Sequence, residues 1–152
     1  MTCFSPSAAI AAAETTRRIA MIDEAEAAGR LDFGQARTLR ACWLAIAAAC
    51  GAHRELPDLV GHTKLLHPQN LAGQPATIHY APEDFIHRSA WQGELRRALA
   101  TARGRARENA SQANRQVVST LLVVAIAAGV VPLPMRQATD PSNDQFQQEN
   151  AA

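Results

Sequence analysis

The sequence is poor in aromatic residues, which make up 5% of the chain: two tryptophans, one tyrosine and four phenylalanines among 152 residues. Aromatic and β-branched side chains fill the faces of β-sheets, and the large ones here are concentrated in a single region. Alanine, which favours helix and lets helices approach closely, is abundant instead. The length suits one domain, or a smaller helical domain with an appended segment. We therefore predict an all-α protein.

Cysteine is also scarce, with only Cys3, Cys42 and Cys50. An odd number at these spacings indicates no disulfide framework, so we expect a reducing compartment. No secretory signal peptide is recognisable at the N-terminus. Catalytic motifs are missing too: there is no nucleophile elbow, and residues 61–64 lack the first glycine and the spacing of a phosphate-binding loop. We expect a non-enzymatic protein without a cofactor.

The net charge of +1 gives no global field, but the charges are unevenly placed. Arginine dominates residues 86–116, whereas residues 137–152 carry acids and no cation. Lys64 is the single lysine in the chain. The preference for arginine and alanine is typical of a GC-rich bacterial genome or a mobile genetic element, which concerns the source and not the chemistry.

The first predicted helix covers residues 6–28. Ser5 can cap its N-terminus, and Pro6 fits the first helical position because its φ is already helical. Gly29 supplies the left-handed residue that commonly follows the end of a helix.

A second helix is predicted over residues 33–50, because Asp32 and Gln35 have the spacing of a capping box. Its apolar residues recur at steps of four, three and four and so share one stripe: Leu39, Trp43, Ile46 and Cys50. The short connection to the first helix favours an antiparallel hairpin.

The middle of the chain, residues 51–81, has too many prolines and glycines for a long helix and is predicted to be an irregular loop. A long third helix is expected to begin at Pro82 and run to about Ala102. We assign residues 1–102 to one helical domain. Residues 103–116 follow as a basic, polar helical connector, because nothing there forbids the helix from continuing.

Residues 117–135 contain no charged side chain and form an apolar C-terminal segment, which is just long enough for a membrane anchor. Pro132 and Pro134 are expected to end its helix near Val131. With arginines on its N-terminal side, the positive-inside rule would place the N-terminus in the cytoplasm. The alternatives are a central helix of a soluble bundle and an interfacial or partner-binding helix. Residues 136–152 are expected to form a disordered polar tail.

All five histidines lie in or beside the middle loop, and a metal site there is a secondary hypothesis. Thiolate and imidazole are good zinc ligands, and a loop could gather four of them: Cys50, His53, His62 and His67. Their spacing matches no established zinc pattern, and the alternative is ordinary loop and core residues.

The arginines of the third helix are the candidate binding residues: Arg96, Arg97, Arg103, Arg105 and Arg107. Guanidinium groups pair with phosphates of nucleic acids. They would equally lie on anionic lipid headgroups beside a membrane anchor, or form a solvated face. On one uninterrupted helix Arg96, Arg103 and Arg107 share a face.

These observations lead to two principal hypotheses. The first is a bacterial accessory protein tethered to the inner membrane by its C-terminal helix, which acts by binding a protein partner through the middle loop. The second is a soluble, cytoplasmic helical protein that binds nucleic acid through its arginine helix, alone or as a homo-oligomer.

Overall fold

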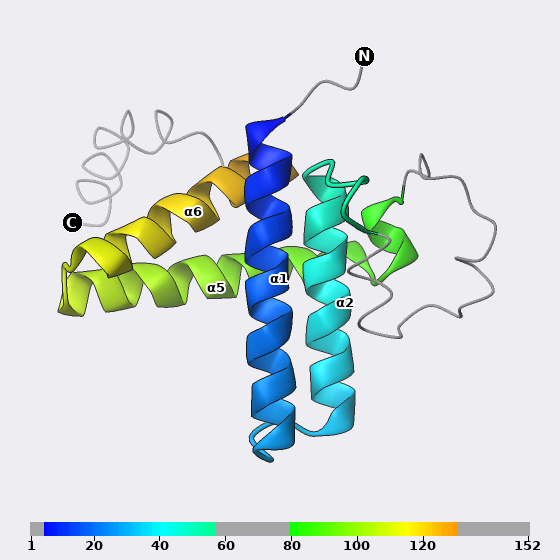
Figure 1. Ribbon diagram of the computed structural model, residues 1–152, viewed down its shortest axis with the longest axis horizontal. Helices are drawn as coiled ribbons and strands as arrows, with labels where there is room; N and C mark the ends of the chain where they lie inside the picture. The colour runs from blue at the N-terminus through cyan, green and yellow to red at the C-terminus, as the bar shows by residue number, and fades with distance from the viewer. Residues whose placement is uncertain (1–4, 57–79, 131–152) are drawn as a thin grey trace, which may run out of the picture.

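The computed structural model describes residues 5–56 and 80–130. Within these two ranges every regular element is helical: four α-helices and one short 3₁₀ helix, arranged in space as Figure 1 shows. The prediction of an all-α protein is confirmed.

The N-terminal hairpin consists of α1 (Pro6–Ala27) and α2 (Phe33–Ala49), which run antiparallel side by side (Figure 1). Pro6 occupies the first helical position, but the Ser5 hydroxyl pairs with the Ser7 hydroxyl at 2.8 Å instead of capping a backbone N–H. Gly29 has the left-handed φ of 75° that the sequence predicted. The hairpin itself is therefore as expected.

The capping box that begins α2 is present. Asp32 Oδ1 accepts a hydrogen bond from the Gln35 backbone N–H at 2.7 Å, and Gln35 Oε1 accepts one from the Asp32 backbone N–H at 3.0 Å. α2 is the central helix of the fold, because residues 41–48 are all buried. Trp43, Leu44 and Ile46 are among the largest fully buried side chains.

The prediction of one helix from Pro82 needs correction. Pro82–Asp84 forms a single 3₁₀ turn, η1, in which Asp84 Oδ2 accepts a hydrogen bond from the Ala81 backbone N–H at 2.8 Å. The chain then leaves the helical path because Phe85 and Ile86 pack their side chains against the core. The α-helix α5 (Arg88–Glu108) begins only afterwards, with His87 as its N-cap.

The helical connector predicted at residues 103–116 is corrected as well. α5 continues past Gly104 but ends at Glu108, and Asn109 is extended, with φ −142° and ψ 101°. Ser111 then caps a new helix, α6 (Gln112–Ala128), by accepting the Asn114 N–H at 3.1 Å. The chain therefore reverses direction, and α6 runs back along α5 (Figure 1).

The end of α5, the reversal and the start of α6 form what we call the arm, residues 103–120. In Figure 1 the arm projects beyond α1, on the side away from α2. No residue from Arg103 to Thr120 is buried. The arm thus adds surface to the molecule without adding to the fully buried core.

The apolar half of α6 belongs to the core. Leu121, Val124 and Ala125 are fully buried in one cluster with side chains of α1, α2 and α5. α6 ends at Ala128, where Gly129 takes a φ of 74°. In the described ranges, no helix combines the length and the hydropathy that a membrane span needs. The rest of the predicted apolar segment, 131–135, the polar tail and loop residues 57–79 lie outside the described residues.

Candidate functional site

The arm carries a local excess of positive charge. It carries four arginines, Arg103, Arg105, Arg107 and Arg115, and a single acid, Glu108. None of these four guanidinium groups forms an ion pair with any described residue. An unpaired guanidinium keeps all its N–H donors available for an anionic ligand.

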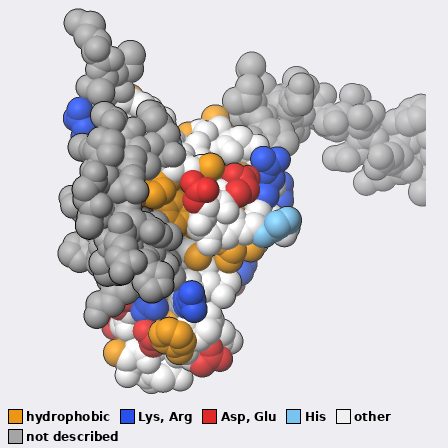
Figure 2. Space-filling model, turned by 90° about the vertical axis from the view of Figure 1, so that its right-hand side faces the viewer, with side chains coloured by type: hydrophobic (Ala, Val, Ile, Leu, Met, Phe, Trp, Pro, Cys, Tyr) orange, Lys and Arg blue, Asp and Glu red, His pale blue; other side chains and the backbone are white. Residues whose placement is uncertain are grey.

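Several other arginines are neutralised by a carboxylate. Arg40 of α2 reaches Asp23 and Glu26 of α1, each at 2.7 Å, and so links the two helices of the hairpin. Arg88 at the other end of α5 pairs with Glu83 at 3.1 Å. On the face in Figure 2, which looks at the molecule from its side away from the arm, acidic and basic side chains are interspersed where the structure describes them. This face therefore lacks the one-sided charge of the arm.

The predicted arginines divide between two sides of α5. Arg103 and Arg107 lie one turn apart and, with Arg115 of α6, line an open groove of about 690 Å³ between the two helices. Arg97 and Arg105 line a separate pocket of about 250 Å³ between α1, α5 and α6. Arg96 is exposed and lines neither hollow. The shared face predicted for Arg96, Arg103 and Arg107 thus contributes two arginines to the groove.

The groove has small side chains between its arginines. Ala100, Ala106 and Ser119 line it together with Val118 and the three arginines. No aromatic side chain of the described residues lines it. It can accept a chain of phosphates, but it offers no ring on which a base could stack.

Arg97 differs from the arm arginines because it is held by Glu94. Its Nε and Nη2 donate to the two carboxylate oxygens at 2.8 and 2.6 Å, and Glu94 is only 8% exposed. The hydrogen bonds that Arg97 donates to Glu94 raise the pKa of Arg97 above its ordinary value. This bidentate pair fixes the direction of the guanidinium group.

Sequence reasoning missed the contribution of α1 to the pocket. Arg17 and Arg18 both donate to the buried carboxylate of Glu14, with closest distances of 2.6 and 2.8 Å. Arg18 also lies over the Trp43 ring, 4.9 Å from its centroid. The available signal was the spacing of Glu14 to these arginines, three and four residues, which repeats in Glu94 and Arg97.

The candidate metal ligands are only partly described. Cys50 is buried, its thiol donates to the Val124 carbonyl oxygen at 3.4 Å, and burial raises its pKa to about 12. A thiol held in this way is poorly suited to ligation, because the thiolate is the form that binds metal. His53 is half-buried, and His62 and His67 lie outside the described residues. Among the residues that are described, no three His, Cys, Asp or Glu side chains come together as a ligand set.

Comparison of the chain with protein-family models, with curated proteins and with solved structures finds no match. The arm and the two hollows beside it are therefore the features from which a function can be inferred.

Proposed function

We propose that this protein is a non-enzymatic nucleic-acid-binding protein that places its arm on the phosphate backbone of a duplex. The observation that carries the proposal is the groove between α5 and α6, whose three arginines, Arg103, Arg107 and Arg115, have no ion-pair partner among the described residues. Each such arginine that contacts a phosphate releases condensed counterions, which favours binding.

The small side chains of the groove support contact with a backbone more than with bases. Because Ala100, Ala106 and Ser119 are small, the sugar–phosphate backbone of a nucleic-acid strand can approach α5 and α6 closely there. The Ser119 hydroxyl can also donate a hydrogen bond to a phosphate oxygen. The described residues that line the groove include no aromatic and no amide side chain, so they provide no contacts to base edges. Binding is therefore expected to depend little on sequence.

The packing of α6 favours this proposal over a membrane tether. Leu121, Val124 and Ala125 are fully buried against the other helices. Inserting α6 into a bilayer would detach these side chains and expose their partners in α1, α2 and α5 to water.

The test is the salt dependence of binding to a fluorescent duplex of about 20 base pairs, measured by anisotropy with the full chain. Three phosphate contacts predict a slope of log K against log salt of about −2.7, or a loss of affinity of about 40-fold between about 50 and 200 mM salt. The triple variant Arg103→Gln, Arg107→Gln, Arg115→Gln is expected to lose most of this slope.

The matched control removes the same charge elsewhere. Arg30→Gln, Arg37→Gln, Arg88→Gln changes three exposed arginines of the loop after α1, of α2 and of the far end of α5. This control should bind the duplex as the wild type does. Absence of binding by the wild type at low salt, or an equal loss in both triple variants, would refute the proposal.

A further inference from the structure

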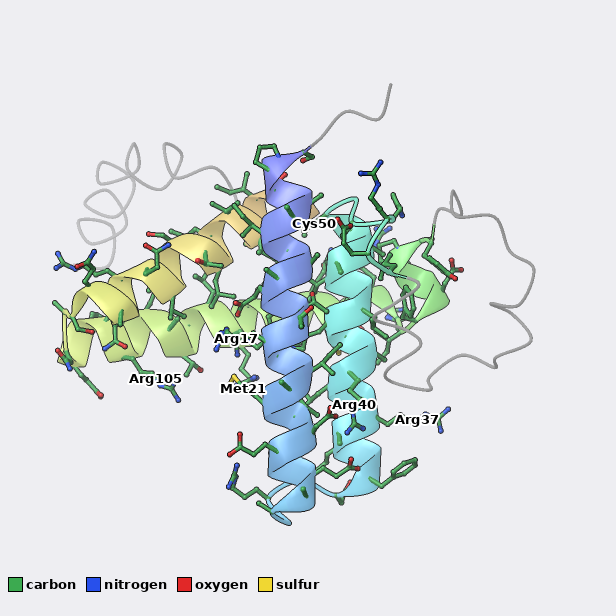
Figure 3. All side chains as sticks on the ribbon, in the orientation of Figure 1. Arg17, Met21, Arg37, Arg40, Cys50 and Arg105 are labelled. Carbon is green, nitrogen blue, oxygen red and sulfur yellow. The ribbon has the colours of Figure 1, made fainter. Side chains whose placement is uncertain are left out.

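The pocket on the other side of α5 is a second, more enclosed basic site. It has a volume of about 250 Å³ and lies between α1, α5 and α6. Four of its lining residues are arginines, Arg17 and Arg18 from α1 and Arg97 and Arg105 from α5. Figure 3 shows Arg17 and Met21 on the side of α1 that faces α5, and Arg105 extending from α5 into the same angle between the two helices.

Three of these arginines are held in place. Arg17 donates from Nε and Nη2 to Glu14 at 3.0 and 2.6 Å, and Arg18 donates from Nε to the same carboxylate at 2.8 Å. Arg97 has the corresponding bidentate bond to Glu94. An arginine whose side chain is already fixed loses less conformational entropy when it binds an anion.

The acids that fix the arginines do not neutralise the pocket. Glu14 and Glu94 contribute two negative charges against the four positive charges of the lining arginines, and neither carboxylate is among the lining residues. Arg105 has no ion pair with any residue in the described ranges. The pocket therefore retains an excess of about two positive charges, the magnitude that a phosphate monoester carries near neutral pH, about −1.5 to −2.

The size and the remaining polar groups agree with such a ligand. Thr101 and Asn114 also line the pocket and can donate hydrogen bonds from a hydroxyl and an amide. A volume of 250 Å³ equals roughly eight water molecules at about 30 Å³ each, which exceeds a bare phosphate ion. We propose that this pocket binds a phosphate monoester group, with Arg105 supplying the charge that no carboxylate of the described chain balances.

This inference goes beyond the proposed function and can fail separately from it. Calorimetric titration of the full chain with inorganic phosphate and with pyrophosphate, against chloride at equal ionic strength, should show saturable binding. Arg105→Gln is expected to weaken it by about tenfold, because a charge-assisted contact is lost. Arg96→Gln removes one exposed arginine of the same helix outside the pocket and should change affinity less than twofold.

The groove variant separates the two sites. Arg103→Gln, Arg107→Gln, Arg115→Gln should retain phosphate binding, whatever happens to its affinity for a duplex. The affinities of a duplex with a 5′-phosphate and of the same duplex with a 5′-hydroxyl are then compared. If the phosphorylated duplex binds more tightly, and if Arg105→Gln abolishes this difference in affinity, a nucleic-acid end is the source of the phosphate. Equal affinity of the two duplexes, with pyrophosphate still bound, would identify a free small molecule. If the wild type shows no saturable response to either probe, or if both single variants lose binding equally, the inference is overturned.

Discussion

At the residue scale, Glu14 is the clearest case of one side chain that organises several others. It is 6% exposed on α1 and receives hydrogen bonds from Arg17 and Arg18, while its neighbour Thr15 donates to the Trp43 carbonyl oxygen at 3.2 Å. Burial by itself would raise the pKa of Glu14, but the two arginines outweigh it and the pKa lies below its ordinary value. The carboxylate therefore stabilises the fold in its charged form.

A lowered pKa gives a defined pH dependence. The stabilisation from Glu14 is fully present above the unfolded-state pKa near 4.5 and is lost as the pH falls through the lower pKa of the folded state. We expect Glu14→Gln to reduce the free energy of unfolding on the order of 1 kcal/mol at neutral pH. The difference from the wild type should shrink as the pH falls from about 7 to about 3.

Urea unfolding at a series of pH values measures this difference. Glu24→Gln is the control, because Glu24 is exposed on the same helix and forms no ion pair with any described residue. Parallel pH curves for the wild type and Glu14→Gln would contradict the role assigned to this carboxylate.

The sequence predicted a helix end correctly where one short motif determines that end. The Asp32 and Gln35 capping box and Gly29 act within a few residues, and each was correctly placed. Such patterns could not predict the pocket. It depends on bringing Arg17 of α1 to the same hollow as Arg105 of α5, and the sequence gives no measure of how α1 crosses α5.

At the scale of elements, the reversal between α5 and α6 depends on Ser111. The segment 109–111 contains neither glycine nor proline, so the sequence predicted a continuous helix through it. The turn is instead fixed by side chains: the Ser111 hydroxyl accepts the Asn114 N–H, and Asn114 Nδ2 donates to the Asn109 carbonyl oxygen at 2.8 Å. Serine and asparagine compete with the helix for backbone hydrogen bonds, which is why they can end one helix and begin another.

Removing this cap should weaken α6. Ser111→Ala is expected to lower the free energy of unfolding by about 1 kcal/mol, the usual cost of losing an N-cap. Ser119→Ala, in the exposed interior of α6, should leave stability unchanged or raise it by a few tenths of a kcal/mol, since alanine is the better helix former. Thermal unfolding followed by circular dichroism distinguishes the two, and equal stabilities would argue against a role for Ser111 in the reversal.

At the scale of the whole molecule, α6 closes a core that the other helices leave incomplete. Leu121 is fully buried in the cluster that joins α1, α2, α5 and α6. The sequence identified this segment as apolar but could not choose between a core helix and a membrane span, because both need the same side chains. The choice depends on how the other helices pack around α6: in the structure they cover Leu121, Val124 and Ala125, so these side chains form a buried stripe of a core helix.

Shortening a buried side chain of α6 should therefore destabilise the entire fold. Leu121→Ala is expected to cost about 2–5 kcal/mol of the free energy of unfolding, because it leaves a cavity between helices. Val123→Ala, at a side chain that is 37% exposed, should cost about 0.5 kcal/mol or less. Denaturant unfolding of both variants without lipid or detergent tests this, and similar small effects at the two positions would mean that α6 is not part of the core.

The lack of buried side chains in the arm has a dynamic consequence. Opening of a structural segment is resisted by the apolar contacts that it would expose. Residues 103–120 have few such contacts, whereas residues 41–48 of α2 are all buried. Backbone amides of the arm should therefore exchange with deuterated water through local fluctuations. The amides of residues 41–48 should exchange much later, when the molecule unfolds as a whole. The part of the protein with the most unpaired positive charge is thus also the part whose backbone can adapt its shape without disturbing the core.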